Sequence, residues 1–483
     1  MSISTALNNA MTGLNAASRG AAVVSGNIAN ALTPDYARRS LELTTSTISG
    51  NGVNVAGITR HQDPVLLADL RTTDADMVNT TVISEFHAGF ENLVGTATDD
   101  TSIAARLSTL ESSLITAASL PDSAQRLDDV ARSARDLTEA LNAASDGVRQ
   151  MRSDADRTIG KQVDTLNQTL QDLEKLNARI PAVRNSGGDV GALLDQQQAL
   201  INQVNEIVPV NAVARENDRV SLYSDGGLIL LEGSAVEFSF STTGETMPHM
   251  TVGNGLLSGL EANGQPVRIT GDYAQIRGGA LVAQFQVRDE LAVEAQADLD
   301  AVARDLIERF ESPGLDPTVT ATDPGVFTDG GARFDVTAVT GLASRIELNT
   351  SVDPNAGGDS WKLRAGLGAA TPGDPGDASQ LQAFGAILDD TRPVSGASFG
   401  TGTLRAAEIA EALLSKAGTD AHRAEQRQSF AASAQQEMEQ IVAEQGVDSD
   451  AELQRLILIE QAYSANAQII TVVNELMDTL LRI

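Results

Sequence analysis

The sequence contains no cysteine, and only 3% of its 483 residues are aromatic. Without cysteine, the chain forms no disulfides, performs no thiol catalysis and has no cysteine-based metal site. Its cores must be aliphatic and alanine-rich, a composition that suits closely packed helices.

Sequence patterns of catalysis and ligand binding are also scarce. The histidines at 61, 87, 249 and 422 lie far apart and show no metal-binding spacing such as H-E-x-x-H. The segment Gly50-Asn51-Gly52 lacks the third glycine and the helix of a nucleotide-binding loop. We therefore expect a protein that is not an enzyme, with no catalytic, cofactor-binding or metal-binding residues.

The formal net charge is -31, so the surface should repel nucleic acid and anionic membranes. We find no apolar run as long as a membrane span. The first charged residue is Arg19, so the basic start of a cleavable secretory signal is missing. We expect no nucleic-acid or membrane partner, and a chain that stays in the cytoplasm or is exported without cleavage.

Apolar residues at both chain ends step by alternating threes and fours, which predicts a helix face that packs against a partner helix. The N-terminal seam consists of Ile3, Leu7, Ala10, Leu14, Ala17, Ala21, Val24 and Ile28. The C-terminal seam consists of Leu456, Ile459, Tyr463, Asn466, Ile470, Val473, Met477 and Leu480. We predict that the two ends pair as a coiled-coil-like domain and also bind other copies of the chain.

Between the ends, the pattern is helical from about residue 64 to 208. Its most regular part begins near Asp122 and continues to Pro181, where we expect it to end. Strand patterns at 37–45 and 52–59 predict a hairpin that turns at Ser49–Gly52. Ser449 and Glu452 form a capping-box pattern at the start of the last helix.

These patterns predict a mainly α fold with β insertions (α+β). We expect a terminal helical domain with a hairpin (1–60 and 445–483) and a helical bundle (61–210, 273–312 and 378–444). We also expect a β insertion at 211–272 and an outer β-rich domain at 313–377, with strands near 333–339, 345–348 and 361–363.

The chain resembles the axial proteins of the bacterial flagellum. Residues 29–38, Ala-Asn-Ala-Leu-Thr-Pro-Asp-Tyr-Ala-Arg, are similar to the family signature A-N-x-x-T-P-G-Y-x-R, with Asp35 in place of the usual glycine. Residues 461–470 resemble the C-terminal signature. The resemblance implies an assembly motif made of Asn30, Thr33, Pro34, Tyr36, Arg38, Tyr463 and Asn466. We expect Tyr36 to pack beside the turn and Arg38 to bind a carbonyl or carboxylate.

The long helical middle resembles the members of this family that join the hook to the filament. The resemblance implies a structural subunit that forms a helical ring with copies of itself. Its partners would be the hook protein, a second hook-filament junction protein and an export chaperone at the C-terminal helix. The protein would be extracellular, in the flagellum, after type III export without a cleaved signal peptide. No cofactor is implied.

Two alternatives stay open. The chain could be a hook or distal rod protein of the same family, which the number and position of the β insertions would distinguish. It could also carry a secreted enzyme or adhesin domain on a flagellar scaffold, within 211–272 or 313–379. A deep pocket with convergent ionisable groups would favour that second alternative.

Overall fold

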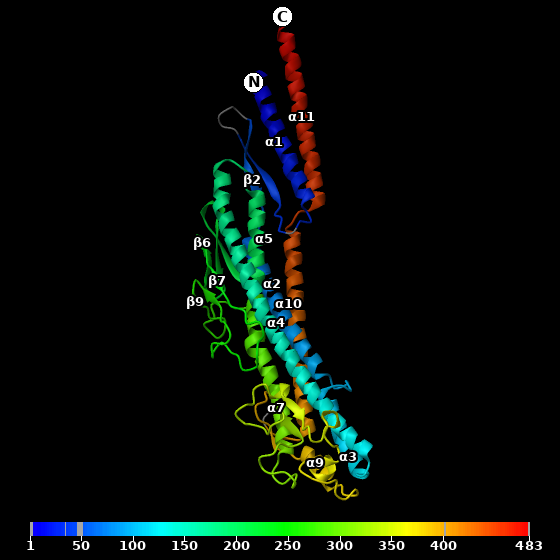
Figure 1. Ribbon diagram of the computed structural model, residues 1–483. Coiled ribbons are helices and arrows are strands. Elements are labelled where there is room, and N and C mark those ends of the chain that lie inside the picture. Colours follow the sequence, from blue (N-terminus) through cyan, green and yellow to red (C-terminus); the bar gives the residue numbers. More distant parts are fainter. Residues whose placement is uncertain (1–2, 34, 46–51, 400–401, 482–483) are drawn as a thin grey trace.

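The computed structural model describes residues 3–33, 35–45, 52–399 and 402–481. The molecule is elongated, and both chain ends lie at the same tip (Figure 1). Four helices longer than thirty residues give it this shape: α2 (Pro64–Val94), α4 (Ala124–Asn185), α10 (Ala406–Glu444) and α11 (Ser449–Leu481). A mainly α fold with small antiparallel sheets agrees with the prediction.

At the tip, α1 (Ile3–Ala29) lies beside α11, next to a two-stranded sheet. The sheet pairs β1 (Arg39–Thr45) with β2 (Val53–Arg60), and its register shifts between Glu42 and Leu43. The predicted hairpin is therefore present. Residues 49–51 of its predicted turn lie outside the described residues.

The helix α4 is the spine of the body, with 62 residues. Its predicted apolar stripe is buried along almost the whole length, from Leu127 to Ile180. Around it pack α3 (Ile103–Ser119), α5 (Gly191–Ile207), α6 (Gly279–Gln286) and α7 (Ala292–Phe310). The body is completed by α9 (Ser379–Asp389), which packs on α3.

The prediction that Pro181 ends this helix is wrong, because α4 continues to Asn185. Proline removes one backbone donor and crowds the carbonyl four residues earlier. The last turn is held by packing instead. Ile180 is fully buried in a small cluster with Leu176 and Val190, so tertiary contacts outweigh the local cost.

Two small sheets cover one side of α4 and α5. The first has the order β3 (Val210–Ala214), β4 (Val220–Ser224), β5 (Ile229–Glu232) and β6 (Ser234–Ala235). The second joins β7 (Phe238–Ser239), β8 (Glu261–Ala262) and β9 (Gln265–Pro266). The inner residues Leu222, Leu230 and Leu231 are fully buried against the helices. The strands expected in 211–272 are present.

Strand content in 313–377 is lower than predicted. The described strands there are β10 (Phe327–Asp329) and β11 (Ile346–Leu348), joined to turns and a short helix, α8 (Lys362–Ala365). The expected strands at 333–339 and 361–363 are wrong. Aspartate side chains accept backbone N–H groups two residues on, as Asp335 does from Thr337, and such turns compete with a strand ladder. Farther on, β12 (Arg392–Pro393) pairs with β13 (Thr403–Leu404).

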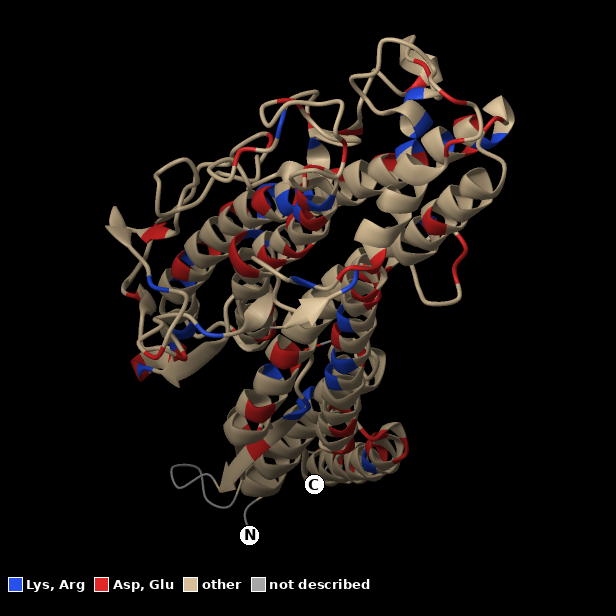
Figure 2. Cartoon of the chain, turned by 90° about the horizontal axis from the view of Figure 1, so that it is seen from below, with Lys and Arg blue, Asp and Glu red and all other residues tan. Residues whose placement is uncertain are grey.

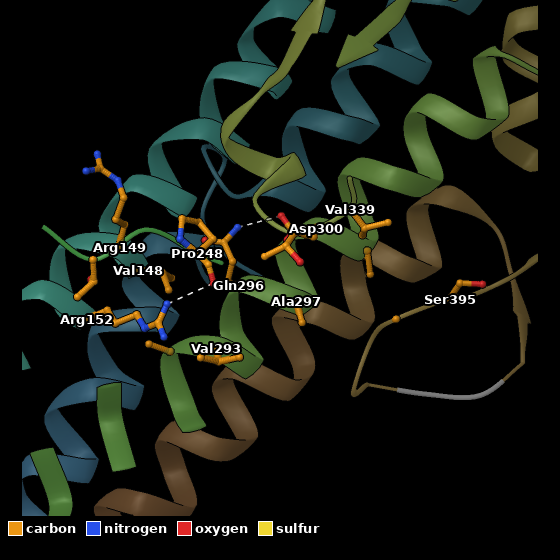
Figure 3. Close-up of a pocket in the computed structure, with 15 residues that line it drawn as sticks. Val148, Arg149, Arg152, Pro248, Val293, Gln296, Ala297, Asp300, Val339 and Ser395 are labelled. Carbon is orange, nitrogen blue, oxygen red and sulfur yellow. Dashed lines mark hydrogen bonds between the residues drawn. The ribbon is translucent and has the colours of Figure 1, made fainter. Parts of the chain in front are cut away.

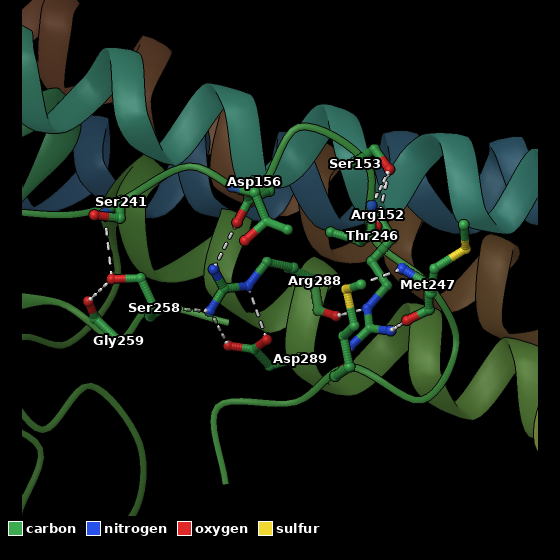
Figure 4. Close-up of polar contacts among 12 residues, drawn as sticks. Arg152, Ser153, Asp156, Ser241, Thr246, Met247, Ser258, Gly259, Arg288 and Asp289 are labelled. Carbon is green, nitrogen blue, oxygen red and sulfur yellow. Dashed lines mark hydrogen bonds and ion pairs between the residues drawn. The ribbon is translucent and has the colours of Figure 1, made fainter. Parts of the chain in front are cut away.

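A buried ion pair fastens the β insertion at 211–272 to the helices (Figure 4). Arg288 lies in a π-helical turn, Val287–Leu291, between α6 and α7. Its guanidinium donates to Asp156 of α4 at 2.8 Å, and neither side chain is exposed. It also donates to the Ser258 carbonyl and forms two 2.8 Å bonds to Asp289. The wider helical turn thus directs a charged side chain into the core, where every partner is fixed.

We expect Arg288→Met to lower the free energy of unfolding by about 3–5 kcal/mol, because Asp156 would keep a buried charge without its partner. The matched control is Arg149→Met on the neighbouring face of α4. Arg149 pairs with Asp146 and Glu245 at the surface, so its loss should cost under about 1 kcal/mol. Chemical denaturation followed by helical circular dichroism measures both. Equal losses would contradict the role assigned to Arg288.

The long helices α2 and α10 also meet through a half-buried carboxyl. Asp74 of α2 accepts a 2.9 Å hydrogen bond from Gln435 of α10. Burial raises the pKa of Asp74, and the nearby Glu439 carboxylate raises it further. The charged form is therefore disfavoured in the folded protein, and protonation stabilises this contact.

We expect Asp74→Asn to make the protein more stable at pH 7, because the amide keeps an oxygen for Gln435 without a charge. The gain should shrink as the pH falls through the raised pKa and vanish below about pH 4, the ordinary aspartate range. Thermal unfolding across this pH range, with Asp76→Asn as the exposed control on the same helix, tests the sign. A gain that grows on acidification would refute it.

Candidate assembly site

The two chain-end helices run antiparallel, and three contacts define their register. Asn27 meets Glu452, Gly20 faces Ile459 and Gly13 faces Asn466. A Cβ atom at Gly13 would lie 2.8 Å from the Asn466 amide, and one at Gly20 would lie 3.2 Å from the Ile459 methyl. The contacts step by seven residues on both helices, so the glycines let the two backbones approach closely once every two turns.

The predicted seam residues are only partly covered. Val24 and Val473 are buried, while Leu7, Leu14, Ile28, Leu456, Ile459, Asn466 and Ile470 are half-buried. Tyr463, Met477 and Leu480 are 43%, 45% and 58% exposed. The small buried residues of α1 are Ala10 and Ala17 of the seam, together with Ala16 and Gly20 outside it. Coiled-coil packing of the seams stays a prediction.

A buried polar network closes the pair at its inner end. The Glu452 carboxylate, 1% exposed, accepts the Asn27 amide at 3.0 Å and the Arg38 Nε at 2.8 Å. The Asn27 side chain also accepts the Arg39 backbone N–H at 3.0 Å and the Tyr36 hydroxyl at 2.9 Å. Each polar group of this network thus has a partner, as buried groups require.

The assembly motif forms the turn that leads into this network. Asn30 donates to the Gly26 carbonyl at 2.9 Å, and the Thr33 hydroxyl donates to Asn30 at 3.2 Å. Asp35 has a φ of +63°, the left-handed region that favours glycine. This explains why glycine is usual at that position of the family signature and why aspartate can replace it. Pro34 lies outside the described residues.

Tyr36 and Arg38 face the chain-end helices, not open solvent. The Tyr36 ring is half-buried beside α1, and the Arg39 guanidinium lies 4.9 Å from its centroid. Burial raises the pKa of the Tyr36 hydroxyl, so that it stays a donor to Asn27. Arg38 binds a carboxylate of the last helix, a partner 414 residues away in sequence.

A second set of contacts fastens the hairpin to the body. Asp195 of α5 accepts both Arg39 of β1 and Arg60 of β2, the latter at 2.9 Å. Burial lowers the pKa of Arg60. Two turns further along α5, Asn202 donates to Asp35 at 2.7 Å and accepts from Arg71 at 3.0 Å. Burial lowers the pKa of Arg71 to about 10, still well above neutral pH.

Sequence reasoning missed Asn27, Asp195 and the role of Glu452. The predicted capping box of Ser449 and Glu452 is wrong, because Asp448 accepts the N–H groups of Asp450 and Ala451 and Glu452 points to α1. The spacing of residues in the sequence contained a signal for this contact. Asn27 lies seven residues after Gly20, and Glu452 lies seven residues before Ile459, so each polar residue falls on the same helix face as a residue of the helix–helix contact.

A pocket in the body is lined by ionisable groups that are engaged in internal hydrogen bonds. A hollow of about 140 Å³ between α4 and α7 includes Arg152, Gln296 and Asp300 (Figure 3). Asp300 accepts the N–H groups of Gly341 and Ala343 and the Gln296 amide. Arg152 donates to backbone carbonyls, including that of Arg288 at 2.7 Å. Among the described residues, no group of three or more His, Cys, Asp and Glu could hold a metal ion.

Residues 396–400 read Gly-Ala-Ser-Phe-Gly, a G-x-S-x-G spacing that serine hydrolases use. Sequence reasoning overlooked it. Ser398 lies between the short strands β12 and β13, not on a strand-to-helix turn. Its hydroxyl donates to both oxygens of Asp298 at 2.8 Å, and Lys416 lies 3.4 Å from the same carboxylate. Acidic neighbours raise the pKa of Lys416 against the opposing effect of burial, so this lysine stays charged and is no base. The contacts anchor the loop.

The expectation that no apolar run is as long as a membrane span is wrong: in the part of the chain that the structure describes, Ala406–Leu481 contains an 18-residue window long and apolar enough to cross a membrane. Only 6% of that window is buried. A helix that meets partner helices in an assembly has the same composition, so this finding by itself is weak evidence for a membrane span.

Two family models match the chain. Residues 89–313 match the flagellar hook-associated protein FlgK helical domain, and residues 438–483 match the flagellar basal body rod FlgEFG protein C-terminal region. Among relatives, flagellar hook-associated protein 1 of Escherichia coli (strain K12) is 24% identical, with 100% of both chains aligned. The protein of that name from Salmonella typhimurium is 27% identical over 48% of this chain and 43% of its own.

A solved structure of the flagellar hook junction protein FlgK from Burkholderia pseudomallei aligns with a TM-score of 0.45 and 19% identity. The alignment covers 56% of this chain and 47% of the Burkholderia pseudomallei chain, and its TM-score is too low to establish a shared fold. The matched C-terminal region and the paired chain ends support an axial protein of the bacterial flagellum. Within that class, the helical-domain match and the full-length alignment support a hook-associated protein of the FlgK type.

We expect Glu452→Ala to loosen α11 from α1, because Asn27 and Arg38 would both lose their buried acceptor. Hydrogen bonds to a charged group contribute about 1.5–3 kcal/mol, so amide exchange across 449–475 should accelerate by at least tenfold. The control is Glu460→Ala, an exposed position two turns further along the same helix. Unchanged exchange in the Glu452 variant would show that the network does not hold the pair together.

Proposed function

We propose that this protein is a structural subunit of the flagellum that forms the junction between hook and filament and assembles by packing of its chain-end helices. One observation carries the packing mechanism. The last helix is held by α1 at one face but leaves a second apolar stripe exposed. That stripe consists of Leu458, Ile469, Val472 and Leu476, which are 44–65% exposed.

An exposed apolar stripe of this length is costly for a lone subunit in water. Each large side chain contributes roughly 1.5–3 kcal/mol when it is buried, so the stripe provides a driving force for association. The stripe and the α1 contact occupy different faces of α11, so a subunit can keep its own pair while it binds another. This supports a ring of copies bound through the terminal domain.

The partners follow from the family. We propose hook protein on one side of the ring and a second hook-filament junction protein on the other. Before assembly, the same apolar stripe of α11 would be covered by a helical chaperone during type III export. The family is structural, and the ionisable clusters described above are engaged in internal hydrogen bonds, so the proposed function needs no catalysis.

The match of residues 89–313 to the FlgK helical domain favours a junction protein over a hook or rod protein. The charged surface agrees with a soluble outer wall. Acidic and basic residues lie interspersed along the helices and outer loops of the body (Figure 2), with an acidic excess that gives the net charge of -31.

The test is a deletion strain examined by electron microscopy. We expect hooks of normal length without filaments, and filament regrowth when the full chain is restored. Restoring a chain with Leu458→Asp and Leu476→Asp, which places charges on the exposed stripe, should fail to regrow filaments. The matched control is Tyr273→Asp, at a 79% exposed aromatic of the body. Normal filaments in the deletion strain would refute the proposed function.

A further inference from the structure

A groove runs between α1, α11 and the hairpin at the tip of the molecule. It has a volume of about 310 Å³. Its floor is a row of small residues of α1, from Gly13 to Gly20, and its walls come from the hairpin and from α11. The hairpin residues Leu43 and Val53 on one wall are 51% and 36% exposed. A cavity of about 150 Å³ can hold a benzene ring, so this groove has room for two or three aliphatic side chains.

The groove is apolar and also contains an arginine that can bind a carboxylate. Among the described residues that line it, the charged ones are Arg455 and Arg39, the latter already paired with Asp195 of α5, and no acid is present. A ligand for this surface should therefore present aliphatic side chains together with carboxylates.

The last turn of α11 has that chemistry. From Gln461 to Ile483 the charged side chains are Glu475, Asp478 and Arg482. Met477, Leu480 and Leu481 share one helix face, at spacings of three and four, and are 45%, 58% and 85% exposed. The helix register places Leu476 opposite Ile3, so these three residues lie past the described part of α1 (Figure 1).

We propose that the groove of one copy binds the last turn of α11 from a second copy, with Met477, Leu480 and Leu481 as the inserted side chains. This rests on the proposed function, and it adds a second contact between copies to the one proposed for the exposed stripe of α11. Within one chain the tip cannot reach its own groove, because Ala462 and Leu480 are separated by 18 residues of straight helix, about 27 Å.

The contact joins two different surfaces of the same chain. A head-to-tail contact of this kind leaves a free groove at one end and a free tip at the other, so it propagates into a ring or a helix and does not stop at a dimer. The arrangement would thus produce the kind of assembly that a flagellar junction requires.

The natural sequence has no cysteine, so engineered cysteines report the contact directly. We expect the full chain carrying both Ala462→Cys and Leu480→Cys to form a ladder of disulfide-linked oligomers on mild oxidation. A link within one chain is impossible, because a disulfide needs Cα atoms about 4.4–6.8 Å apart. The matched control, Tyr273→Cys with Leu480→Cys, replaces the groove position by an exposed residue elsewhere and should give no ladder.

The two single variants decide the geometry. Mixed together, Ala462→Cys and Leu480→Cys should yield disulfide dimers that contain one chain of each, whereas each variant alone should stay monomeric. Dimers of Ala462→Cys alone would show a symmetric contact and overturn the proposal. So would the absence of any ladder at concentrations up to the millimolar range. If filaments still depend on the chain in the deletion strain, only this inference fails and the proposed function stands.

Discussion

The structure depends on one buried carboxylate. Glu452 lies at the start of the last helix, is almost without exposure, and binds both Asn27 of the first helix and Arg38 of the loop that follows it. A buried charge is stable only when its partners are fixed, so the two ends of the chain and the turn between helix and hairpin must adopt one arrangement together. The antiparallel register of the chain ends follows from this contact.

Because the two chain ends pair, the whole body is an insertion in the sequence between α1 and α11. The helix α4 supports this body through a continuous aliphatic face. The insertions attach to the helices by charged groups: Arg288 with Asp156 of α4 for the segment at 241–260, and Asp300 of α7 for the loop at 341–343. These clusters resemble catalytic sites in composition, but their contacts show that they serve as fasteners between layers.

The terminal domain joins the body through few contacts. Asp195 holds Arg39 and Arg60 of the hairpin, and Asn202 holds Asp35 of the turn. The continuous helical layers end there, because α10 stops at Glu444 and α11 begins after a break at Ser449. The tip and the body are therefore joined by side-chain contacts of the hairpin and the turn, and not by a continuous helix.

The sequence alone determined the elements with strong periodicity. The apolar stripe of α4 was predicted because burial of its aliphatic face dominates its energetics, whereas the chain-end helices and the hairpin were predicted from periodicity and turn residues. The proline and aspartate within Thr33–Tyr36 predicted the turn there. Local rules were less successful where packing competes, as at Pro181, where the burial of Ile180 extends the helix past a proline.

Only the tertiary structure decided what the polar residues do. The sequence pattern favoured a capping role for Glu452, yet a partner 425 residues away makes it a buried acceptor. Periodicity indicated which face of α1 is apolar, but the closest approach to α11 uses Gly13 and Gly20, since small residues alone let the backbones come together. Contacts between distant segments depend on where the whole chain places them, and no local pattern records that placement.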